Sequence, residues 1–340
     1  MRIESYSGVS FVSIYSIDLQ FQTAVRLGCA GLDDQNTTLT IPADRMFSWI
    51  ALGWLRLFGE ADFQKSIVES YSSSKPALVI SDGFPLVDGD LCVPIPGWIS
   101  KLRPHNKQHE LPFDQKKLRG KWIQLDRLQA CMRGSEVIDI SALHQPVVAT
   151  HIQSVRIGQG KGEDSLPFST GVVVPRNSEI SSSATNILNF KTLVEVENDE
   201  LAERLESVLQ FVKEEGFGGN RSSGLGQIKN VDLKTTRPKH TDSSNTGIKS
   251  GYALLSSCIP TDEMIESVSR SEADSNSYSI GTRSGWLYDK NGRATDYRKP
   301  SVSIFETGSL FVTRPNGRLA DISQHGHTCF RYGVPFILEG

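Results

Sequence analysis

The feature that most constrains the fold is an amphipathic segment, residues 199–215, which a glycine-rich stretch and an apolar strand segment follow directly. Two acids at its start suit the positive end of a helix, and Gly216 follows its last turn. The pattern therefore predicts a helix over 199–215 with one buried face. Its apolar residues recur at three- and four-residue steps: Leu201, Leu205, Val208, Leu209 and Val212.

Apolar and polar residues alternate over 17–27, which predicts a half-buried antiparallel strand. Residues 43–58 have helical spacing, with Pro42 near the start and Gly59 after the end. Asp88-Gly89 predicts a hairpin turn, and turn chemistry explains the carboxylates Asp82, Asp88 and Asp90. We further predict strands at 77–81, 90–95 and 225–233.

The order strand, helix, two strands, helix, strand is that of a ferredoxin-like βαββαβ fold. Between the second pair of strands and the second helix, residues 97–198 form a long irregular segment with strand fragments at 147–157 and 171–174. We therefore predict an α+β protein of two ferredoxin-like (RRM-like) domains. The first covers residues 1–234 with a large insertion at about 97–198, and a more degenerate second covers 250–340.

A polar linker is predicted at 235–250, where serine, threonine, proline and glycine gather. Beyond it, we expect a strand at 252–258 and a helix over 260–269. Turns are predicted at Asn291-Gly292 and Asn316-Gly317. The remaining predicted strands of the second domain are 278–288, 309–314 and 334–338.

Charge and cysteine usage narrow the class of protein. The net charge of -3 argues against a protein that coats nucleic acid by bulk charge. The five cysteines form no CxxC pair, so a zinc ribbon is not expected, and their odd number favours a reducing compartment. No run reaches the about 18 apolar residues of a membrane span, and the N-terminus is unlike a secretory signal. We expect a soluble protein of the cytoplasm.

The near-neutral total conceals two opposed segments. Residues 101–133 hold nine Lys/Arg against three acids, and residues 195–215 hold two Lys/Arg against eight acids, which are expected on the outer face of the second helix. Trp98, Phe113 and Trp122 are interleaved with the basic residues. Basic side chains with aromatics suit a single-stranded RNA path, in which phosphates are neutralised and bases stack. A solvated surface loop is the alternative explanation of the same charges.

The glycine-rich stretch 216–226 carries the sharpest motif, with five glycines in eleven residues. Glycines let a backbone approach a ligand closely, and exposed N–H groups can then hold phosphates. Arg221 adds a phosphate-binding guanidinium, and Ser222 and Ser223 add hydroxyl donors. The stretch lacks the Gly-Lys-Ser/Thr end of a Walker loop and follows a helix, unlike a Rossmann fingerprint. A flexible connection between helix and strand explains it equally well.

Two further clusters have competing explanations. Trp286 and Tyr288 share a strand face near Arg283, so they form either a base-stacking platform or core, and we expect core for at least one. His325, His327 and Cys329 alternate, but three ligands within five residues on one face do not easily close a tetrahedral metal site. A general base for RNA cleavage is conceivable at each remaining histidine, without a partner constellation for any: His105, His109, His144 and His151.

The sequence resembles the RAMP proteins of CRISPR interference complexes, which are RNA-binding proteins with a glycine-rich loop after the second helix. The fourth Csm subunit of type III-A effector complexes, in the Cas-five-like group, is the most similar. Ser81-Asp82-Gly83-Phe84-Pro85 resembles its Ser-Asp-x-Phe-Pro stretch, whereas Pro42 departs from a common His. Other similar segments occur in the same order: 42–48, 90–96, 116–118, 252–256, 282–286, 306–311 and 331–333.

The resemblance implies a non-catalytic subunit that holds the 5′ repeat-derived tag of the CRISPR RNA in antiviral defence. Its partners would be the large polymerase-nuclease subunit and the adjacent backbone RAMP subunit, with no membrane, cofactor or metal. The alternatives are a CRISPR-RNA-processing endoribonuclease of the RAMP class and a nucleotide-binding enzyme that uses the glycine-rich stretch. The predicted RNA-binding residues are Arg45, Ser48, Lys116, Lys117, Arg119, Lys121, Gly216, Phe217, Gly218, Gly219, Asn220, Arg221, Ser222, Ser223, Gly224, Gly226, Arg283 and Trp286.

Overall fold

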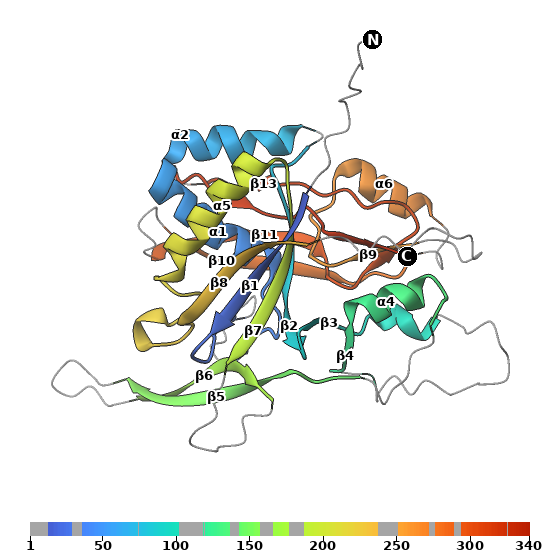
Figure 1. The fold of residues 1–340 in the computed structure, drawn as a ribbon. Helices are drawn as coiled ribbons and strands as arrows, with labels where there is room; N and C mark the ends of the chain where they lie inside the picture. The colour runs from blue at the N-terminus through green and yellow to red at the C-terminus, as the bar shows by residue number, and fades with distance from the viewer. Residues whose placement is uncertain are drawn as a thin grey trace, which may run out of the picture.

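A six-stranded antiparallel sheet organises the molecule (Figure 1). The computed structural model describes residues 13–28, 36–73, 75–101, 118, 120–136, 143–156, 166–176, 187–236, 251–271, 276–288, 294–324 and 326–340. The strand order is β4-β3-β2-β7-β1-β8. The strands are β1 (Ser13–Phe21), β2 (Leu78–Val87), β3 (Asp90–Pro94), β4 (Trp122–Gln124), β7 (Leu188–Val196) and β8 (Ile228–Thr235).

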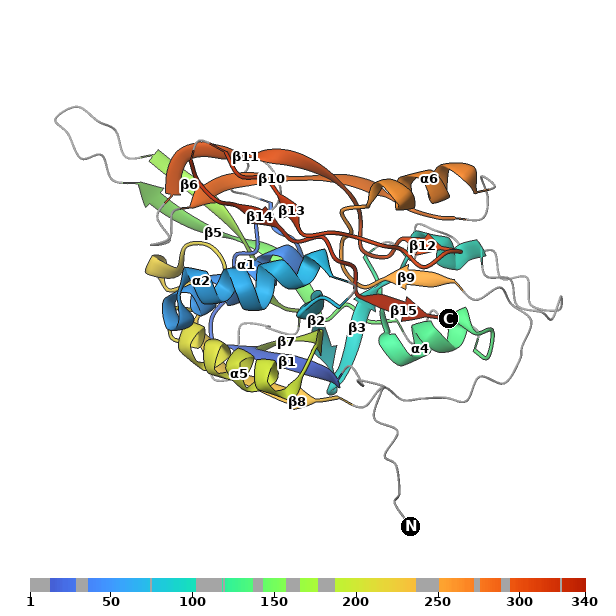
Figure 2. The same ribbon diagram turned by 90° about the horizontal axis from the view of Figure 1, so that it is seen from above.

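Two long helices, α1 (Ala43–Phe58) and α5 (Asp199–Lys213), pack against each other beside the sheet (Figures 1 and 2). Gly53 lies where they cross, because a Cβ there would come within 2.4 Å of Val212 Cγ1. The first predicted helix is confirmed with the same bounds, and the second ends two residues early. The short helices α2 (Glu60–Phe63), η1 (Gln64–Val68) and η2 (Glu69–Ser72) follow α1.

The predicted insertion 97–198 is too long at its end, because β7 lies within it. β7 pairs with both β1 and β2, and its residues alternate between buried and half-buried. The predicted strand 90–95 therefore extends the sheet edge as β3 instead of forming a central strand. The predicted strand 17–27 begins earlier, at Ser13, and leaves the sheet after Phe21. The Asp88-Gly89 turn is confirmed by the pairing of Val87 with Asp90.

A separate hairpin of β5 (Val147–Arg156) and β6 (Leu166–Pro175) extends below the sheet in Figure 1. A β-bridge joins Val173 of this hairpin to Val25 in the segment after β1, with N–O distances of 2.8 and 3.3 Å. Between β3 and this hairpin lie the short helix η3 (Gly97–Lys101), β4 and α4 (Leu125–Met132). In both views, α4 lies at the far side of the molecule from α5 (Figures 1 and 2).

The C-terminal part has a three-stranded sheet of order β12-β9-β15 and two hairpin pairs, β10-β11 and β13-β14. The strands predicted at 309–314 and 334–338 are shorter in the structure, where they cover Leu310–Phe311 and Ile337–Glu339. Asn316-Gly317 does not turn a hairpin: a Cβ on Gly317 would lie 2.2 Å from the Gly333 oxygen, so glycine permits a close backbone approach. Asn291-Gly292 lies outside the described residues. The elements are β9 (Tyr252–Leu254), α6 (Asp262–Arg270), β10 (Ile280–Tyr288), β11 (Ala294–Phe305), β12 (Leu310–Phe311), β13 (Ala320–Asp321), β14 (Phe330–Arg331) and β15 (Ile337–Glu339).

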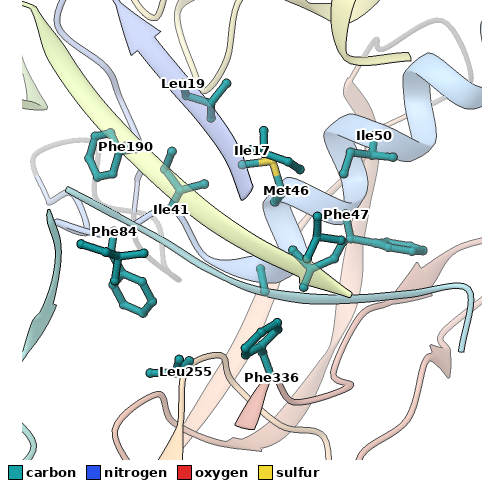
Figure 3. Packing of buried hydrophobic residues seen from close by; sticks show 14 of the residues in the cluster. Ile17, Leu19, Ile41, Met46, Phe47, Ile50, Phe84, Phe190, Leu255 and Phe336 are labelled. Carbon is teal, nitrogen blue, oxygen red and sulfur yellow. The ribbon is translucent and has the colours of Figure 1, made fainter. Parts of the chain in front are cut away.

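The main hydrophobic core contains residues from both halves of the chain. Leu255 and Phe336 lie across β2 from the residues of β1 and α1 (Figure 3). The backbone of β2 continues this contact, since Ile80 N donates to the Tyr332 hydroxyl and Asp82 N donates to the Leu255 oxygen, each at 2.8 Å. The C-terminal part thus completes the core of the large sheet. No helix within the described ranges is long and apolar enough to cross a membrane.

Candidate nucleic-acid interface

The glycine-rich stretch folds into a closed loop between α5 and β8. Phe217 N donates to the Gly226 oxygen at 2.9 Å. A Cβ on Gly226 would lie 1.8 Å from the Phe217 oxygen, and φ at this glycine is +66°. Positive φ is also found at Gly216, Gly218 and Gly224. These glycines are required by the loop's geometry, which is held by specific hydrogen bonds.

Phe217 anchors this loop in the core, so its predicted contact with RNA is wrong. Only 2% of the residue is exposed, and its ring packs edge-on against Trp49 at 5.3 Å between centroids. Trp49 Nε1 donates to the Gly216 oxygen at 3.1 Å, which ties the loop's first residue to α1. The aromatic residue therefore positions the loop from within the core.

Arg26, which the sequence analysis did not select, lies beside the tip of the loop. Gly219 N donates to the Arg26 oxygen at 3.0 Å, and Arg26 Nη1 donates to Asn220 Oδ1 at 3.0 Å. A Cβ on Gly28, two residues later, would be 3.4 Å from Arg45 Nη2, so the Arg45 guanidinium lies against the same segment. Arg26 thus contacts the loop directly, and Arg45 lies against the segment that carries Arg26. We call Arg26, Arg45, Asn220, Arg221 and Ser222 the glycine-loop surface.

Backbone donors are available on this surface. Asn220 has left-handed backbone angles, φ 56° and ψ 33°, and a single helical turn follows it. Within the described ranges, the N–H groups of Asn220, Arg221 and Ser222 donate no backbone hydrogen bond. The Arg221 side chain turns back toward α5, with Nη1 3.7 Å from Glu215 Oε2, while Ser222 and Ser223 are exposed. Successive free N–H groups form a concavity suited to an anionic oxygen.

A buried ion pair places the β10–β11 hairpin next to the start of α1. Arg331 Nη1 lies 3.0 Å from Asp44 Oδ2, and its Nη2 donates to the Ser284 oxygen at 3.2 Å. The hairpin's predicted RNA-binding residues flank Ser284, and α1 carries Arg45 and the exposed Ser48. Ser48 Oγ donates to the Asp44 oxygen at 2.7 Å. The structure thus brings the start of α1 and the strand β10 next to each other.

Trp286 is exposed on this hairpin, at 43%, and is available to stack. The Arg298 guanidinium carbon lies 4.9 Å from the centroid of its ring, which is a cation–π contact. The side chain of Tyr288 lies outside the described residues, so the expected pair on one face is not tested. Arg283, in contrast, faces the interior seam between the two halves, where Asp82 lies.

The basic segment 101–133 contributes no residue to the glycine-loop surface within the described part of the chain. Lys116, Lys117 and Arg119 lie outside the described residues. Lys121 precedes β4, at the opposite sheet edge from β8, and is therefore not part of the glycine-loop surface. Trp98 and Trp122 are only 3% and 2% exposed, so the expectation that they stack with RNA bases is wrong. Trp98 Nε1 instead donates to the Gly308 oxygen at 2.7 Å.

The Ser-Asp-x-Phe-Pro stretch is internal. Asp82 was expected near a turn for structural reasons, but it is buried within β2, and its Oδ1 accepts from Ala43 N at 2.8 Å. Its Oδ2 accepts from Thr307 Oγ1 at 2.7 Å. Burial raises the pKa of Asp82 to about 6, against the opposing effects of these two donors and of Arg283. The residue joins three of the segments on which the family resemblance rests.

The histidines and Cys329 do not assemble into a metal centre within the described part of the chain. Cys329 is buried with Leu287 and Ile322, and the His327 ring packs against Tyr297 at 6.0 Å. His105, His109 and His325 lie outside the described residues. The side chains of His144 and His151 make no hydrogen bond or ion pair to other described residues. The acidic face of α5 is exposed as expected, for example at Glu203 and Glu206.

Comparison with known families and structures tests the resemblance. Residues 249–339 match the family model of the CRISPR Csm4 C-terminal domain. A chain from the crystal structure of the Csm3-Csm4 subcomplex in the type III-A CRISPR-Cas interference complex is similar over 95% of this chain and 98% of its own. The sequence identity with that chain is 13%, and the TM-score is 0.58. No curated protein matches the sequence.

Two further similar structures are Csm1-Csm4 cassettes. The cassette in complex with cA4 contains a chain that is 14% identical, with a TM-score of 0.55 and coverage of 96% of this chain and 97% of that one. The cassette in complex with cA3 gives 12% identity, a TM-score of 0.56 and the same coverage. At such identities the likeness establishes the fold. Residues 249–339 thus match the Csm4 C-terminal domain, and this match, with the shared fold, confirms the predicted resemblance to the fourth Csm subunit of type III-A complexes.

Proposed function

We propose that this protein is a non-catalytic RNA-binding subunit of a type III CRISPR interference complex that holds the 5′ repeat-derived tag of the CRISPR RNA. The observation that carries the proposal is the glycine-loop surface. Arg26 contacts Asn220 there and Arg45 lies against the adjacent Gly28, while the loop offers three successive backbone N–H groups that have no backbone partner within the described ranges. Cations and oriented N–H groups hold phosphates without reading sequence, and the exposed Trp286 can stack a base.

The partners follow from the similar structures. Because those structures join Csm4 to Csm1 and to Csm3, we propose that this chain caps its complex beside the large polymerase-nuclease subunit and contacts the adjacent backbone RAMP subunit, in the cytoplasm. The antiparallel sheet and exposed surface are compatible with such an assembly. Catalysis is assigned to none of its residues, because the described histidines have no acid or base partner.

We also propose a revised domain division. The order β2-β7-β1-β8, with α1 and α5 packed together, supports a first ferredoxin-like domain built from β1, α1, β2, β7, α5 and β8. Its insertion then ends before β7, near residue 187 instead of 198. The C-terminal part, matched by the Csm4 C-terminal domain over 249–339, is proposed as the second, degenerate domain.

RNA binding to the purified full chain tests the function. The double variant Arg26→Gln/Arg45→Gln should bind a repeat-derived single-stranded RNA roughly ten- to a hundredfold more weakly, because two charge-assisted contacts are lost. Loss of two phosphate contacts should also reduce the slope of log Kobs against log salt by about 1.4. Fluorescence anisotropy at several salt concentrations measures both quantities.

The matched control is Lys65→Gln/Lys229→Gln, which removes the same charge from exposed lysines outside the glycine-loop surface. It should retain the wild-type affinity to within a few fold. Equal weakening in both double variants would mean that RNA binds by general charge, and would overturn the site. Incubation of repeat RNA with the wild-type chain should leave it intact; specific cleavage that one His→Ala change abolishes would establish the endoribonuclease instead.

A further inference from the structure

A cavity of about 340 Å³ lies at the seam between the two halves of the chain. Its lining comes from β2, from the segment between β3 and η3, from β9 and β10, and from the segments that precede β10 and follow β11. This volume falls within the range of small-ligand pockets, at its lower end. A single nucleobase fits such a volume, while a folded polymer does not. The cavity is distinct from the glycine-loop surface, since none of that surface's residues line it.

One donor in this cavity has no partner. Arg283 lines it, and the Nε atom of Arg283 is buried without a hydrogen-bond partner among the described residues. An unsatisfied buried donor is costly, so such a group marks a place where a ligand acceptor belongs. Asp82 does not fill that role: its Oδ1 accepts from Ala43 N and its Oδ2 from Thr307 Oγ1, and the Nε atom of Arg283 makes no hydrogen bond to either oxygen.

The charge of the lining selects the kind of acceptor. The charged residues that line the cavity are Arg283, Asp82 and Glu306, so carboxylates outnumber cations. Two carboxylates disfavour a phosphate, whose charge they would repel. A neutral ring with acceptors for Arg283 and N–H donors for Glu306 suits the site, and the edges of nucleobases carry both kinds of group.

Aromatic residues complete the site. Phe84 and Trp98 form buried parts of its wall, and Tyr278 lies at the rim with 44% of its surface exposed. The Tyr278 ring is itself held in place, parallel to Phe311 at 5.9 Å between centroids. Proteins that bind single-stranded RNA commonly stack its unpaired bases on aromatic side chains of this kind.

We propose that the seam cavity receives one unstacked nucleobase of the bound RNA, with Arg283 donating to the base and Tyr278 stacking beside the entrance. This inference rests on the proposed function and adds to it: the glycine-loop surface holds phosphates, and the seam cavity reads a base. Binding there also requires both halves of the chain, since Arg283 and Tyr278 come from the C-terminal part and Phe84 from β2.

The test uses the full chain and the repeat-derived RNA of the binding experiment, with each nucleotide replaced in turn by an abasic one. Wild-type protein should lose roughly tenfold in affinity or more at one position, which is the scale of losing one stacked base. Gly97→Phe blocks the cavity from its exposed rim, where an added Cβ meets nothing within 4 Å. This variant and Arg283→Gln should become insensitive to the abasic replacement at that position.

Gly97→Ala is the matched control, because it adds a Cβ without reaching across the cavity, and it should keep the wild-type pattern. A flat abasic scan in wild type, with RNA still bound, overturns the cavity proposal and leaves the proposed function standing. An unchanged sensitive position in Gly97→Phe overturns it as well. A position that responds to a neutral methylphosphonate instead of to base removal shows a phosphate site. Absence of any RNA binding refutes the proposed function and the cavity together.

Discussion

Asp82 shows how one side chain can hold together segments that are remote in the sequence. Its carboxylate accepts from the first N–H of α1 and from Thr307 in the C-terminal part. The neighbouring Asp44 pairs with Arg331, and Arg283 faces Asp82 from β10. Removing one partner of such a buried pair costs about 3–5 kcal/mol, because it leaves a charge uncompensated. The start of α1 is therefore fixed relative to the C-terminal hairpin.

Asp82 makes stability depend on pH in an unusual direction. Burial raises its pKa from 3.8 to about 6 in the folded protein, so the folded state binds the proton more tightly. The free energy of unfolding then falls as pH rises from about 4 to 6, by an amount on the order of 3 kcal/mol for a shift of two pKa units. Asp44 and Arg283 are the charged groups that face it. Denaturant unfolding from pH 4 to 7 measures this dependence.

Asp82→Asn isolates that contribution, because the amide can still accept from Ala43 N and donate to Thr307. Its stability relative to wild type should increase as pH rises through this window, while other carboxylates cancel in the difference. Parallel pH curves for the two proteins would show that Asp82 does not titrate there. The control is Glu203→Gln, which changes an exposed acid on α5 and should leave the dependence of stability on pH as in wild type.

Residues of this kind are where sequence reasoning fails. A carboxylate beside turn residues predicts a turn, and only the contact with Thr307, 225 positions away, shows that Asp82 is internal. Arg26 was missed for the same reason, since its partner Asn220 is 194 positions distant. Trp98 and Trp122 carry no local sign of burial either. Arg45 was selected through resemblance, and the structure gives it a physical setting beside Gly28.

At the scale of elements, the local sequence pattern was sufficient to predict a helix where apolar residues recur at a regular helical spacing. The helices at 43–58 and 199–215 were predicted because their apolar residues repeat at helical spacing, and the second ends only two residues earlier, at Lys213. β7 has an equally regular alternation, from Leu188 to Val196, but it stands within a long irregular segment. β7 was therefore not predicted, because residues 90–95 were taken as the third strand of the βαββαβ order. Strand pairing in this sheet is decided by partners far along the chain, which a local pattern does not contain.

Substitutions in the glycine loop can test whether RNA binding needs the loop's fixed contacts or only its backbone flexibility. Gly226→Ala forces a Cβ to within 1.8 Å of the Phe217 oxygen, so the loop must open and the Arg26–Asn220 contact must move. We expect a loss of RNA affinity of tenfold or more and a stability loss of about 1–3 kcal/mol. Anisotropy and urea unfolding measure the two effects.

Gly224→Ala is the matched comparison, because this glycine also has positive φ, +83°, but its Cβ would meet nothing within 4 Å. It should cost about 1 kcal/mol and retain most of the affinity. Equal effects of the two substitutions would show that the loop acts through backbone freedom alone. Its fixed contacts with residues 24–28 would then have no role in binding.

At the scale of the whole molecule, the two halves share one hydrophobic core, so we expect them to unfold as one cooperative unit. Phe336 packs with Leu255 and Tyr332 against β2, so its truncation opens a cavity beneath the large sheet. Phe336→Ala should destabilise the full chain by about 3–5 kcal/mol. The loss should appear in a single unfolding transition that both far-UV circular dichroism and tryptophan fluorescence follow.

Phe211→Ala provides the control, because Phe211 is exposed on α5, and it should change stability by no more than about 0.5 kcal/mol. Two separate transitions in Phe336→Ala, with the large sheet unaffected, would contradict the single core. That outcome would mean that the predicted domains fold independently. The Csm4-like C-terminal part would then be a module attached to a complete first domain.

The position of β1 has a consequence for synthesis on the ribosome. β1 begins at Ser13, yet both of its sheet neighbours, β7 and β8, begin only at Leu188 and Ile228. At translation rates of about 5–20 residues per second, the nascent strand waits roughly 10 to 35 s for its first partner. During that time Ile17, Leu19 and Phe21 are exposed on an unpaired strand edge, the kind of surface that chaperones shield. β1 is thus synthesised early but is among the last strands to pair in the sheet.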